Sequence, residues 1–235
     1  MLIHDGKERS TAIDLRLAVT LATVAGGVNA AGFRAMGYFS ANMTGNVSLL
    51  SEHLVLGEWR AVLLAAGLVA AFILGAFLSA LLIERGLRRG LRGVYAYSII
   101  LEGGLIATLT LVDLAMADLQ RSAVLLLGLS CAMGVQNAAT TRISNAQVRT
   151  THLSGVTTDL GIELAILCGG ARQDATRGVI LSRFRLHLAT LLAFLAGGAA
   201  GAACYGLIGP GVYLLAAAIL IGIAVPEARR VHRRA

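Results

Sequence analysis

Charged residues are scarce in this sequence. Asp, Glu, Lys and Arg together make up 14% of the 235 residues, whereas hydrophobic residues make up 57%. A soluble domain usually carries about 25% charged residues, so most of this chain is not adapted to water. A mean hydropathy of +0.76 agrees with this interpretation. The shortage of charge argues against a soluble enzyme and indicates an integral membrane protein.

Aromatic residues and cysteines are also few. Aromatics are 5% of the chain and do not alternate with basic clusters, so the net charge of +7 does not indicate nucleic-acid binding. Cys131, Cys168 and Cys204 lie inside or at the end of apolar runs and form no CxxC motif. Buried apolar cysteines explain this pattern better than a metal site or a disulfide. We expect no metal, no cofactor and no nucleic-acid partner.

Six apolar runs predict transmembrane helices. A bilayer core needs about 20 apolar residues in a helix, and most of these runs approach or exceed that length. They are Leu15–Phe33, Ala61–Ile83, Val94–Val112, Ser122–Ala139, Leu186–Ile208 and the shorter Gly211–Val225. We therefore expect an all-α polytopic membrane protein with about six transmembrane helices, forming a single membrane domain over residues 1–235.

Two further stretches are long enough to span but too polar to face lipid. They are Met36–Leu56 and Thr150–Cys168, and each has a glycine at its polar centre, Gly45 and Gly155. We interpret them as two polar broken or re-entrant elements. Their composition alone leaves open whether they span the membrane or re-enter it.

The positions of the basic residues favour six spans. With six spans and a cytoplasmic N-terminus, 17 of the 20 Lys and Arg residues lie on the cytoplasmic side. With eight spans, the split becomes 13 to 7. Short cytoplasmic loops carry an excess of Lys and Arg, so six spans fit better. We expect a multi-pass protein of the inner (cytoplasmic) membrane with both termini cytoplasmic.

The two halves of the sequence resemble each other. The matching segments are Asn29-Ala30-Ala31 with Asn137-Ala138-Ala139, Arg34 with Arg142, and Thr44-Gly45 with Ser154-Gly155 after a two-residue insertion. We predict a repeat over residues 13–112 and 121–225, followed by a basic tail over residues 226–235. Three spans per repeat would place the second copy upside down, which is a 3+3 inverted repeat, a common plan of transporters. The alternative is chance similarity between Ala- and Gly-rich helices.

The hydroxyl–glycine pairs Thr44-Gly45 and Ser154-Gly155 are the sharpest local motifs. Thr or Ser before Gly can begin a helix, and a helix start inside a membrane presents free N–H groups and a positive dipole end. Such an end suits an anion or a carbonyl oxygen. The alternative is that these hydroxyls only satisfy a kink. The two arginines Arg34 and Arg142 could likewise clamp an anion or anchor helix ends at the headgroups.

Ionisable residues at membrane depth add candidates. Glu102 lies inside an apolar run, and Asp159 and Glu163 are four residues apart, so they share one helix face. Such groups are costly in a membrane and are functional candidates by default. A structural pairing remains open for each of them and for His152. The candidate substrate-binding residues are Asn29, Asn42, Thr44, Gly45, Asn46, Glu102, Asn137, His152, Ser154, Gly155, Asp159 and Glu163.

Three functional hypotheses follow from these features. The leading one is a transporter or channel for a small polar solute or ion. A non-transporting scaffold or regulator would not need buried carboxylates. Whether the chain forms a homo-oligomer is left open by the sequence. An intramembrane enzyme could use only Ser154 with His152 and Asp159, and the two-residue spacing of His152 and Ser154 does not place them together on a helix. We therefore expect no enzymatic activity, with the lipid bilayer and an unidentified solute as the partners.

Two stretches resemble the signatures of a known family. GGVNAAGFRAMGYFSANMTGNVSLL and NAATTRISNAQVRTTHLSGVTTDLGIEL are similar to the paired motifs of the YoaK family of bacterial multi-pass membrane proteins, defined as domain of unknown function 1275. Ser154 departs from the threonine expected there but keeps the hydroxyl. The resemblance covers nearly the whole chain and implies a bacterial inner-membrane protein. It implies no reaction.

Overall fold

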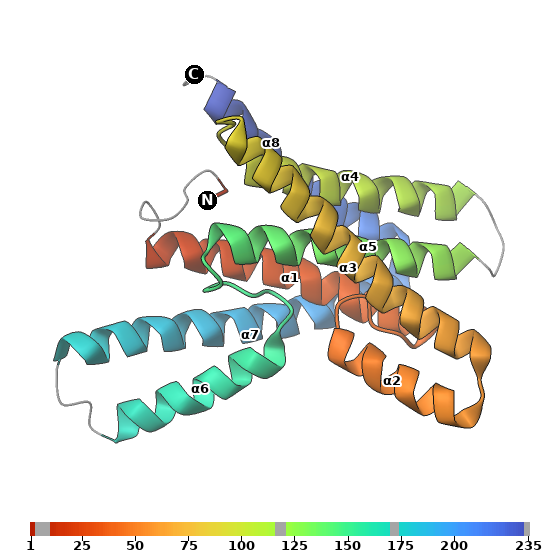
Figure 1. Cartoon of the computed structure of the whole chain (residues 1–235), viewed down its shortest axis with the longest axis horizontal. Coiled ribbons are helices and arrows are strands. Elements are labelled where there is room, and N and C mark those ends of the chain that lie inside the picture. Colours follow the sequence, from red (N-terminus) through yellow and green to blue (C-terminus); the bar gives the residue numbers. More distant parts are fainter. Residues whose placement is uncertain (3–9, 116–120, 170–173, 233–235) are drawn as a thin grey trace.

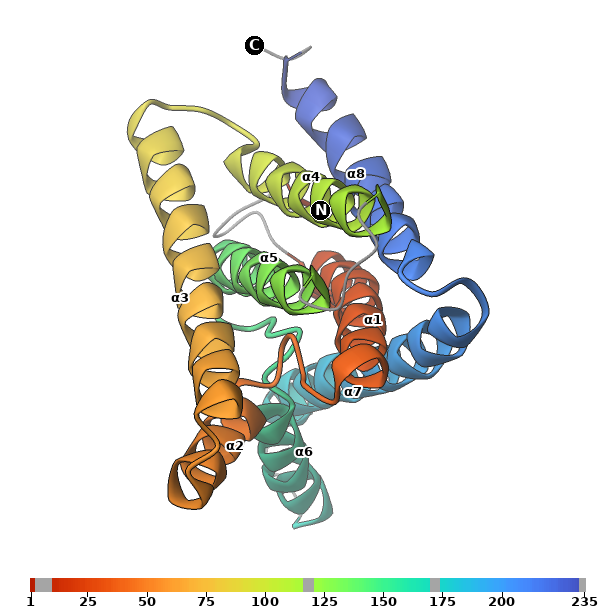
Figure 2. The same cartoon turned by 90° about the vertical axis from the view of Figure 1, so that its right-hand side faces the viewer.

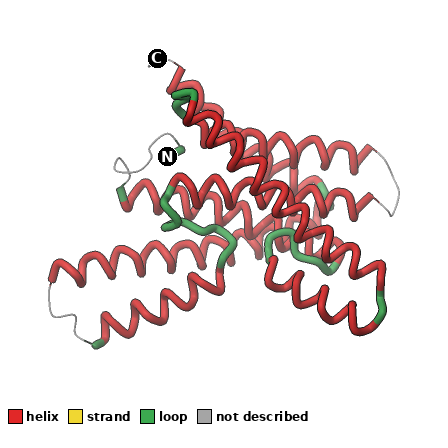
Figure 3. The backbone as a smooth tube through the Cα atoms, viewed as in Figure 1, coloured by secondary structure: helices red, strands yellow, loops and turns green. Residues whose placement is uncertain are grey.

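The computed structural model describes residues 1–2, 10–115, 121–169 and 174–232, and these residues form helices joined by turns and loops (Figures 1 and 3). The helices are α1 (Thr11–Met36), α2 (Met43–Leu56), α3 (Trp59–Arg88), α4 (Val94–Ala115), α5 (Arg121–Ile143), α6 (Leu153–Cys168), α7 (Asp174–Ile208) and α8 (Gly211–His232). The described part contains no strand, so the expected all-α fold class is confirmed.

Six of these helices, α1, α3, α4, α5, α7 and α8, are long and apolar enough to cross a membrane. They coincide with the six predicted spans. Several extend beyond their apolar runs, and the largest difference is in α7, which begins at Asp174 rather than at Leu186. Hydropathy marks where lipid ends, whereas the backbone hydrogen bonds of a helix continue past that boundary. The chain is a multi-pass membrane-spanning helical protein.

The two polar stretches form the short helices α2 and α6. With 14 and 16 residues they are about 21 and 24 Å long at 1.5 Å per residue, shorter than a bilayer core of about 30 Å. Each follows a loop that doubles back from the end of the preceding helix. In Figure 1, α2 and α6 begin near the middle of the bundle and run to opposite ends, where α3 and α7 continue. This path agrees with the expected broken or re-entrant elements.

Small residues bring distant helices into contact. α1 packs mainly on α7, and α3 packs mainly on α5 (Figure 2). A Cβ atom at Gly75 of α3 would lie 1.9 Å from the carbonyl oxygen of Cys131 in α5. A Cβ at Gly197 of α7 would lie 2.0 Å from the carbonyl oxygen of Thr23 in α1. Only glycine permits backbones to approach this closely, as in other small-residue interfaces of membrane helices.

The same crossing occurs in both pairs of helices. Gly26 of α1 faces the carbonyl oxygen of Phe194 in α7, and Gly134 of α5 faces that of Phe72 in α3. In each case a Cβ atom on the glycine would lie 2.1 Å from that oxygen. Gly26 precedes Asn29 by three residues, as Gly134 precedes Asn137. In addition, α4 packs against α8. This pairing is what two repeats related by a two-fold axis would produce, although the inverted repeat itself stays a prediction.

Met1 and the end of α8 lie at the same end of the bundle, to the left in Figure 1. The end of α3, the end of α5 and the start of α7 lie there too, and together with the end of α8 they carry most of the arginines of the described helices. Arg142 forms an ion pair with Glu84 across α5 and α3. It therefore contributes to helix packing at this end of the bundle.

Candidate functional site

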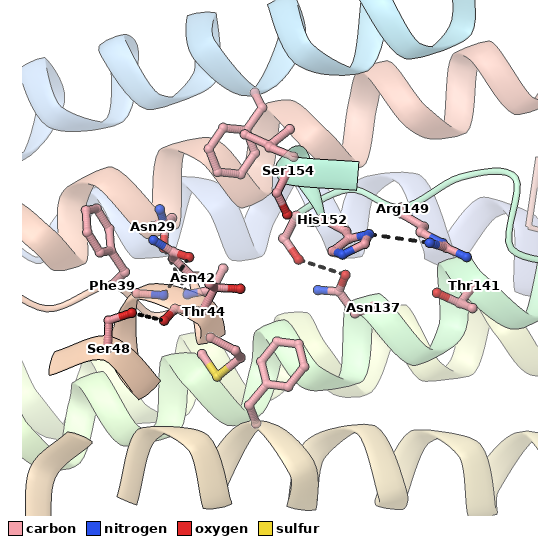
Figure 4. Close-up of a pocket in the computed structure, with 17 residues that line it drawn as sticks. Asn29, Phe39, Asn42, Thr44, Ser48, Asn137, Thr141, Arg149, His152 and Ser154 are labelled. Carbon is pink, nitrogen blue, oxygen red and sulfur yellow. Dashed lines mark hydrogen bonds between the residues drawn. The ribbon is translucent and has the colours of Figure 1, made fainter. Parts of the chain in front are cut away.

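A cavity of about 840 Å³ lies where α2 and α6 begin. Figure 4 shows polar side chains from both halves of the chain around it. Its polar lining residues are Asn29, Asn42, Thr44, Ser48, Asn137, Thr141, Arg149, Thr151, His152 and Ser154. Gly45 also lines the cavity. Seven of the twelve candidate residues named from the sequence thus lie together.

Two asparagines hold the re-entrant loops against the spanning helices. The Asn29 side-chain oxygen, on α1, accepts a hydrogen bond from the backbone N–H of Ala41 at 2.9 Å. The Asn137 side-chain oxygen, on α5, accepts one from the hydroxyl of Thr151 at 2.8 Å (Figure 4). Each bond fixes the chain immediately before a short helix. The two bonds therefore position the starts of α2 and α6 at the cavity.

The start of α2 is capped by its own sequence. The Asn42 side-chain oxygen accepts a hydrogen bond from the N–H of Gly45 at 3.1 Å, which is the usual role of an N-cap asparagine. Thr44 and Ser48 lie on the cavity side of the next turn, and the Ser48 hydroxyl bonds the carbonyl of Thr44 at 3.0 Å. A polar helix start is thus held beside the cavity.

The start of α6 is less completely capped. His152 occupies the N-cap position but makes no side-chain capping bond in the described structure. Instead, its Nδ1 atom lies 3.4 Å from the guanidinium of Arg149. Ser154 lies in the first turn of α6 and lines the cavity with His152 and Arg149. Amide N–H groups at the beginning of α6 are therefore available to a ligand.

The electrostatic character of the cavity is positive. Two helix N-termini are directed into it, and each carries about half a positive charge. Arg149 adds a full positive charge, and His152 adds another when it is protonated. Among the described residues that line the cavity, none is Asp or Glu. The arrangement favours an anion or a group rich in hydrogen-bond acceptors over a cation.

Three phenylalanines complete the lining. Phe39 precedes α2, Phe72 belongs to α3 and Phe194 belongs to α7. Phe39 stacks on Phe33 of α1, with ring centroids 4.4 Å apart. An apolar surface with a few convergent polar groups is the usual composition of a small-molecule site. Such a lining excludes water from part of the cavity and strengthens the polar contacts that remain.

Two candidates near the helix starts do not line the cavity. Asn46 belongs to α2 and is fully buried, and its amide donates to the carbonyl of Phe39 at 2.8 Å. A Cβ atom at Gly155 would lie 2.7 Å from the His152 ring, so this glycine makes room for the imidazole. Both residues support the site without facing it.

Glu102 lies away from the cavity. It is 0% exposed in the packed part of α4, and neither carboxylate oxygen has a hydrogen-bond partner among the described residues. The adjacent Gly103 packs against Ala217 and Ile221 of α8. Glu102 is therefore not positioned to contact a solute in this cavity.

Asp159 and Glu163 line a separate pocket of about 290 Å³ between α6 and α7. Glu163 lies 3.0 Å from Nδ1 of His187 in this pocket. The residues considered for an intramembrane enzyme are therefore divided, because Asp159 lines this pocket while His152 and Ser154 line the central cavity.

The sequence reasoning missed Arg149, Thr151 and the phenylalanines. Arg149 and Thr151 lie within three residues before His152, so the polar loop before the second hydroxyl–glycine pair was a signal for them. The sequence signal for Phe72 and Phe194 is subtler. Each lies three residues before a glycine of a small-residue interface, Gly75 and Gly197. That spacing directs the phenylalanine side chain toward the helix crossing. Whether the side chain then lines a cavity depends on which helices cross there.

Comparisons with known proteins give one match. The family model described as "Protein of unknown function (DUF1275)" matches residues 17–225, which is most of the chain. Comparison with curated proteins gives no significant match, and the same holds for solved structures. The match names no activity, so the function has to be argued from the site.

Proposed function

We propose that this chain, which belongs to the DUF1275 family of proteins of unknown function, is a transporter or channel for a small anionic or acceptor-rich solute. The observation that carries the proposal is the 840 Å³ cavity at which two re-entrant helices begin. Discontinuous helices that meet inside a membrane protein are where many transporters hold their substrates.

The cavity offers the groups that such a solute needs. Backbone N–H groups at a helix start bind phosphate, sulfate or carboxylate oxygens, and Arg149 can pair with them through two parallel hydrogen bonds. Thr44, Ser154 and Asn137 supply further polar contacts. A cation would meet two positive helix ends and an arginine without an opposing carboxylate. Charge therefore supports an anionic solute.

The duplicated helix crossings support the rest of the proposal. An inverted repeat would let the cavity open alternately to the two sides by a rocking of one helix group against the other. The concentration of arginines at the end that carries both termini supports a cytoplasmic position for that end, in an inner membrane.

The test uses purified protein in liposomes on a solid-supported membrane electrode. The panel contains chloride, nitrate, sulfate, phosphate and small carboxylates as sodium salts, with choline and potassium salts of an unreactive anion as cation probes. We expect currents from one or more anions and none from the cations. Because the electrode detects only charge movement, tracer uptake or liposome swelling covers electroneutral transport.

Two matched variants connect the signal to the cavity. Ser154→Leu places bulk inside the cavity, and we expect it to abolish the signal. Thr158→Leu changes an exposed hydroxyl one turn further along α6, outside the cavity, and we expect it to leave the signal unchanged. Leucine favours insertion of a helix into a membrane, so both variants should insert. Transport of cations alone, or equal loss in both variants, would contradict the proposal.

A further inference from the structure

We infer that Glu163 and His187 form a proton-binding site that controls the position of α6, and that protons are the coupling ion of this protein. The coupling rests on the proposed function, whereas the proton site itself does not. The pair lies outside the central cavity, in the pocket between α6 and α7.

The geometry of the pair is that of a buried ionisable contact. Nδ1 of His187 lies 3.0 Å from one Glu163 carboxylate oxygen and 3.1 Å from the other. The Glu163 side chain is 7% exposed and that of His187 is 15% exposed. Both belong to helices in the apolar part of the fold, where an ionisable group is costly unless it is paired. A pair that is buried yet reached by a pocket can exchange protons with solvent.

The pair connects α6 to its only close neighbour among the described helices. α6 packs on α7, and Glu163 is one of two buried residues of α6, the other being Val156. Glu163 lies ten positions after Leu153, about 15 Å along the helix at 1.5 Å per residue. Because Leu153 and Ser154 line the cavity, a tilt of α6 about this contact would move the cavity wall.

The charges around the pair determine the response of the contact to pH. The other charged groups facing this pocket are Asp159 on α6 and Arg183 on α7, while Ala146 and Gln147 before α6 add no charge. With Glu163 ionised and His187 protonated, the contact is an ion pair. Protonation of Glu163 removes the attraction and leaves the His187 cation beside Arg183. Loss of the proton from His187 at higher pH also ends the ion pair and leaves only a neutral hydrogen bond. The strength of the contact between α6 and α7 therefore changes with the protonation of the pair.

The proton balance agrees with an anionic solute. A proton bound by the Glu163–His187 pair adds one positive charge to the protein, while one monovalent anion in the cavity adds one negative charge. Joint occupancy is then neutral overall, which lowers the cost of moving the loaded site within a membrane. The two sites share α6 but no lining residue. Coupling would therefore pass through the position of this helix.

The test measures α6 directly and needs no transport substrate. Spin labels are placed on the exposed Cys168 at the end of α6 and on Leu195→Cys, an exposed position of α7, with Cys131 and Cys204 replaced by serine. The distance between the labels is measured by pulsed electron paramagnetic resonance in liposomes from about pH 5 to about pH 8, the interval in which histidine side chains change charge. We expect the distance distribution to shift across this interval.

Two substitutions decide the assignment. Glu163→Gln keeps the size and polarity but cannot form the ion pair with a protonated His187, so protonation no longer changes the contact and the distance should no longer depend on pH. Asp159→Asn, an exposed carboxylate of the same pocket, should leave the dependence intact. If Glu163→Gln does not fold, His187→Gln takes its place, because it removes the cation of the same ion pair. A pH-independent distance in the labelled parent, or an unchanged pH response in Glu163→Gln, would overturn the proton site.

The labels also separate the two proposals. If the label distance depends on pH and requires Glu163, but the protein transports no solute, the proton site is supported and the transporter proposal is contradicted. If the protein carries anion currents but the label distance does not depend on pH, the transporter proposal is supported and the proton site is contradicted.

Discussion

Asn29 and Asn137 play equivalent parts in the two halves of the structure. Each projects from a spanning helix and accepts a hydrogen bond from the loop before a re-entrant helix, at 2.9 Å from Ala41 and at 2.8 Å from Thr151. The donor differs, since one is a backbone amide and the other a hydroxyl. The shared geometry explains how the loops before α2 and α6 are positioned around one cavity.

The first prediction concerns Asn29. Asn29→Ala leaves the buried N–H of Ala41 without its acceptor, and an unsatisfied buried donor costs about 1–3 kcal/mol. We expect a lower melting temperature in detergent and a weaker response to anions. Ser51→Ala is the control, because this exposed hydroxyl only bonds Val47 within its own helix. Equal melting temperatures for the two variants would show that the Asn29 bond does not hold the loop.

The second prediction concerns the α3–α5 crossing. A Cβ atom at Gly75 would overlap the carbonyl oxygen of Cys131, whereas one at Gly104 has no neighbour within 4 Å. Forcing atoms into a packed contact costs about 1–3 kcal/mol. Gly75→Ala should therefore destabilise the protein in a thermal or detergent unfolding assay, and Gly104→Ala should not. Similar stabilities would mean that these helices are not in backbone contact.

The third prediction concerns the buried carboxyl group of Glu102. The residue has no hydrogen-bond partner among the described residues, and leaving a polar group in this state costs about 1–3 kcal/mol. Val94-Tyr95 near the start of α4 matches Val212-Tyr213 near the start of α8, which aligns Glu102 with the buried Leu220. We expect Glu102→Leu to melt at the same temperature as the parent or higher. A clear loss of stability, with Glu102→Gln unaffected, would reveal an unrecognised polar partner.

The fourth prediction concerns topology. Arg88 lies at the end of α3 on the side of both termini, and Leu207, which is 84% exposed, lies near the opposite end of α7. Single cysteines at these positions in a cysteine-free background are treated on intact cells with a membrane-impermeant thiol reagent. We expect Leu207→Cys to be labelled and Arg88→Cys to be protected. The reverse pattern would place the arginine-rich end outside.

The sequence by itself determined the membrane class, the six spans and the two polar interruptions. These are properties of consecutive residues, because lipid selects for uninterrupted apolar length and excludes unpaired polar groups. The hydroxyl–glycine pairs could also be located in advance, since a helix start has a local chemical signature. Thr44 and Ser154 were found on those grounds.

Only the tertiary structure decided which polar groups share a site. Glu102, Asp159 and Glu163 were candidates together with Thr44 in the sequence, yet the fold places Glu102 in a buried helix contact and the other two in a second pocket. Phe72 and Phe194 lie inside apolar runs of the sequence, and the fold places both in the lining of the cavity. The rotation of each helix about its axis decides these outcomes. That rotation is set by glycine contacts such as Gly75 with Cys131, between residues far apart in the chain, which no local pattern encodes.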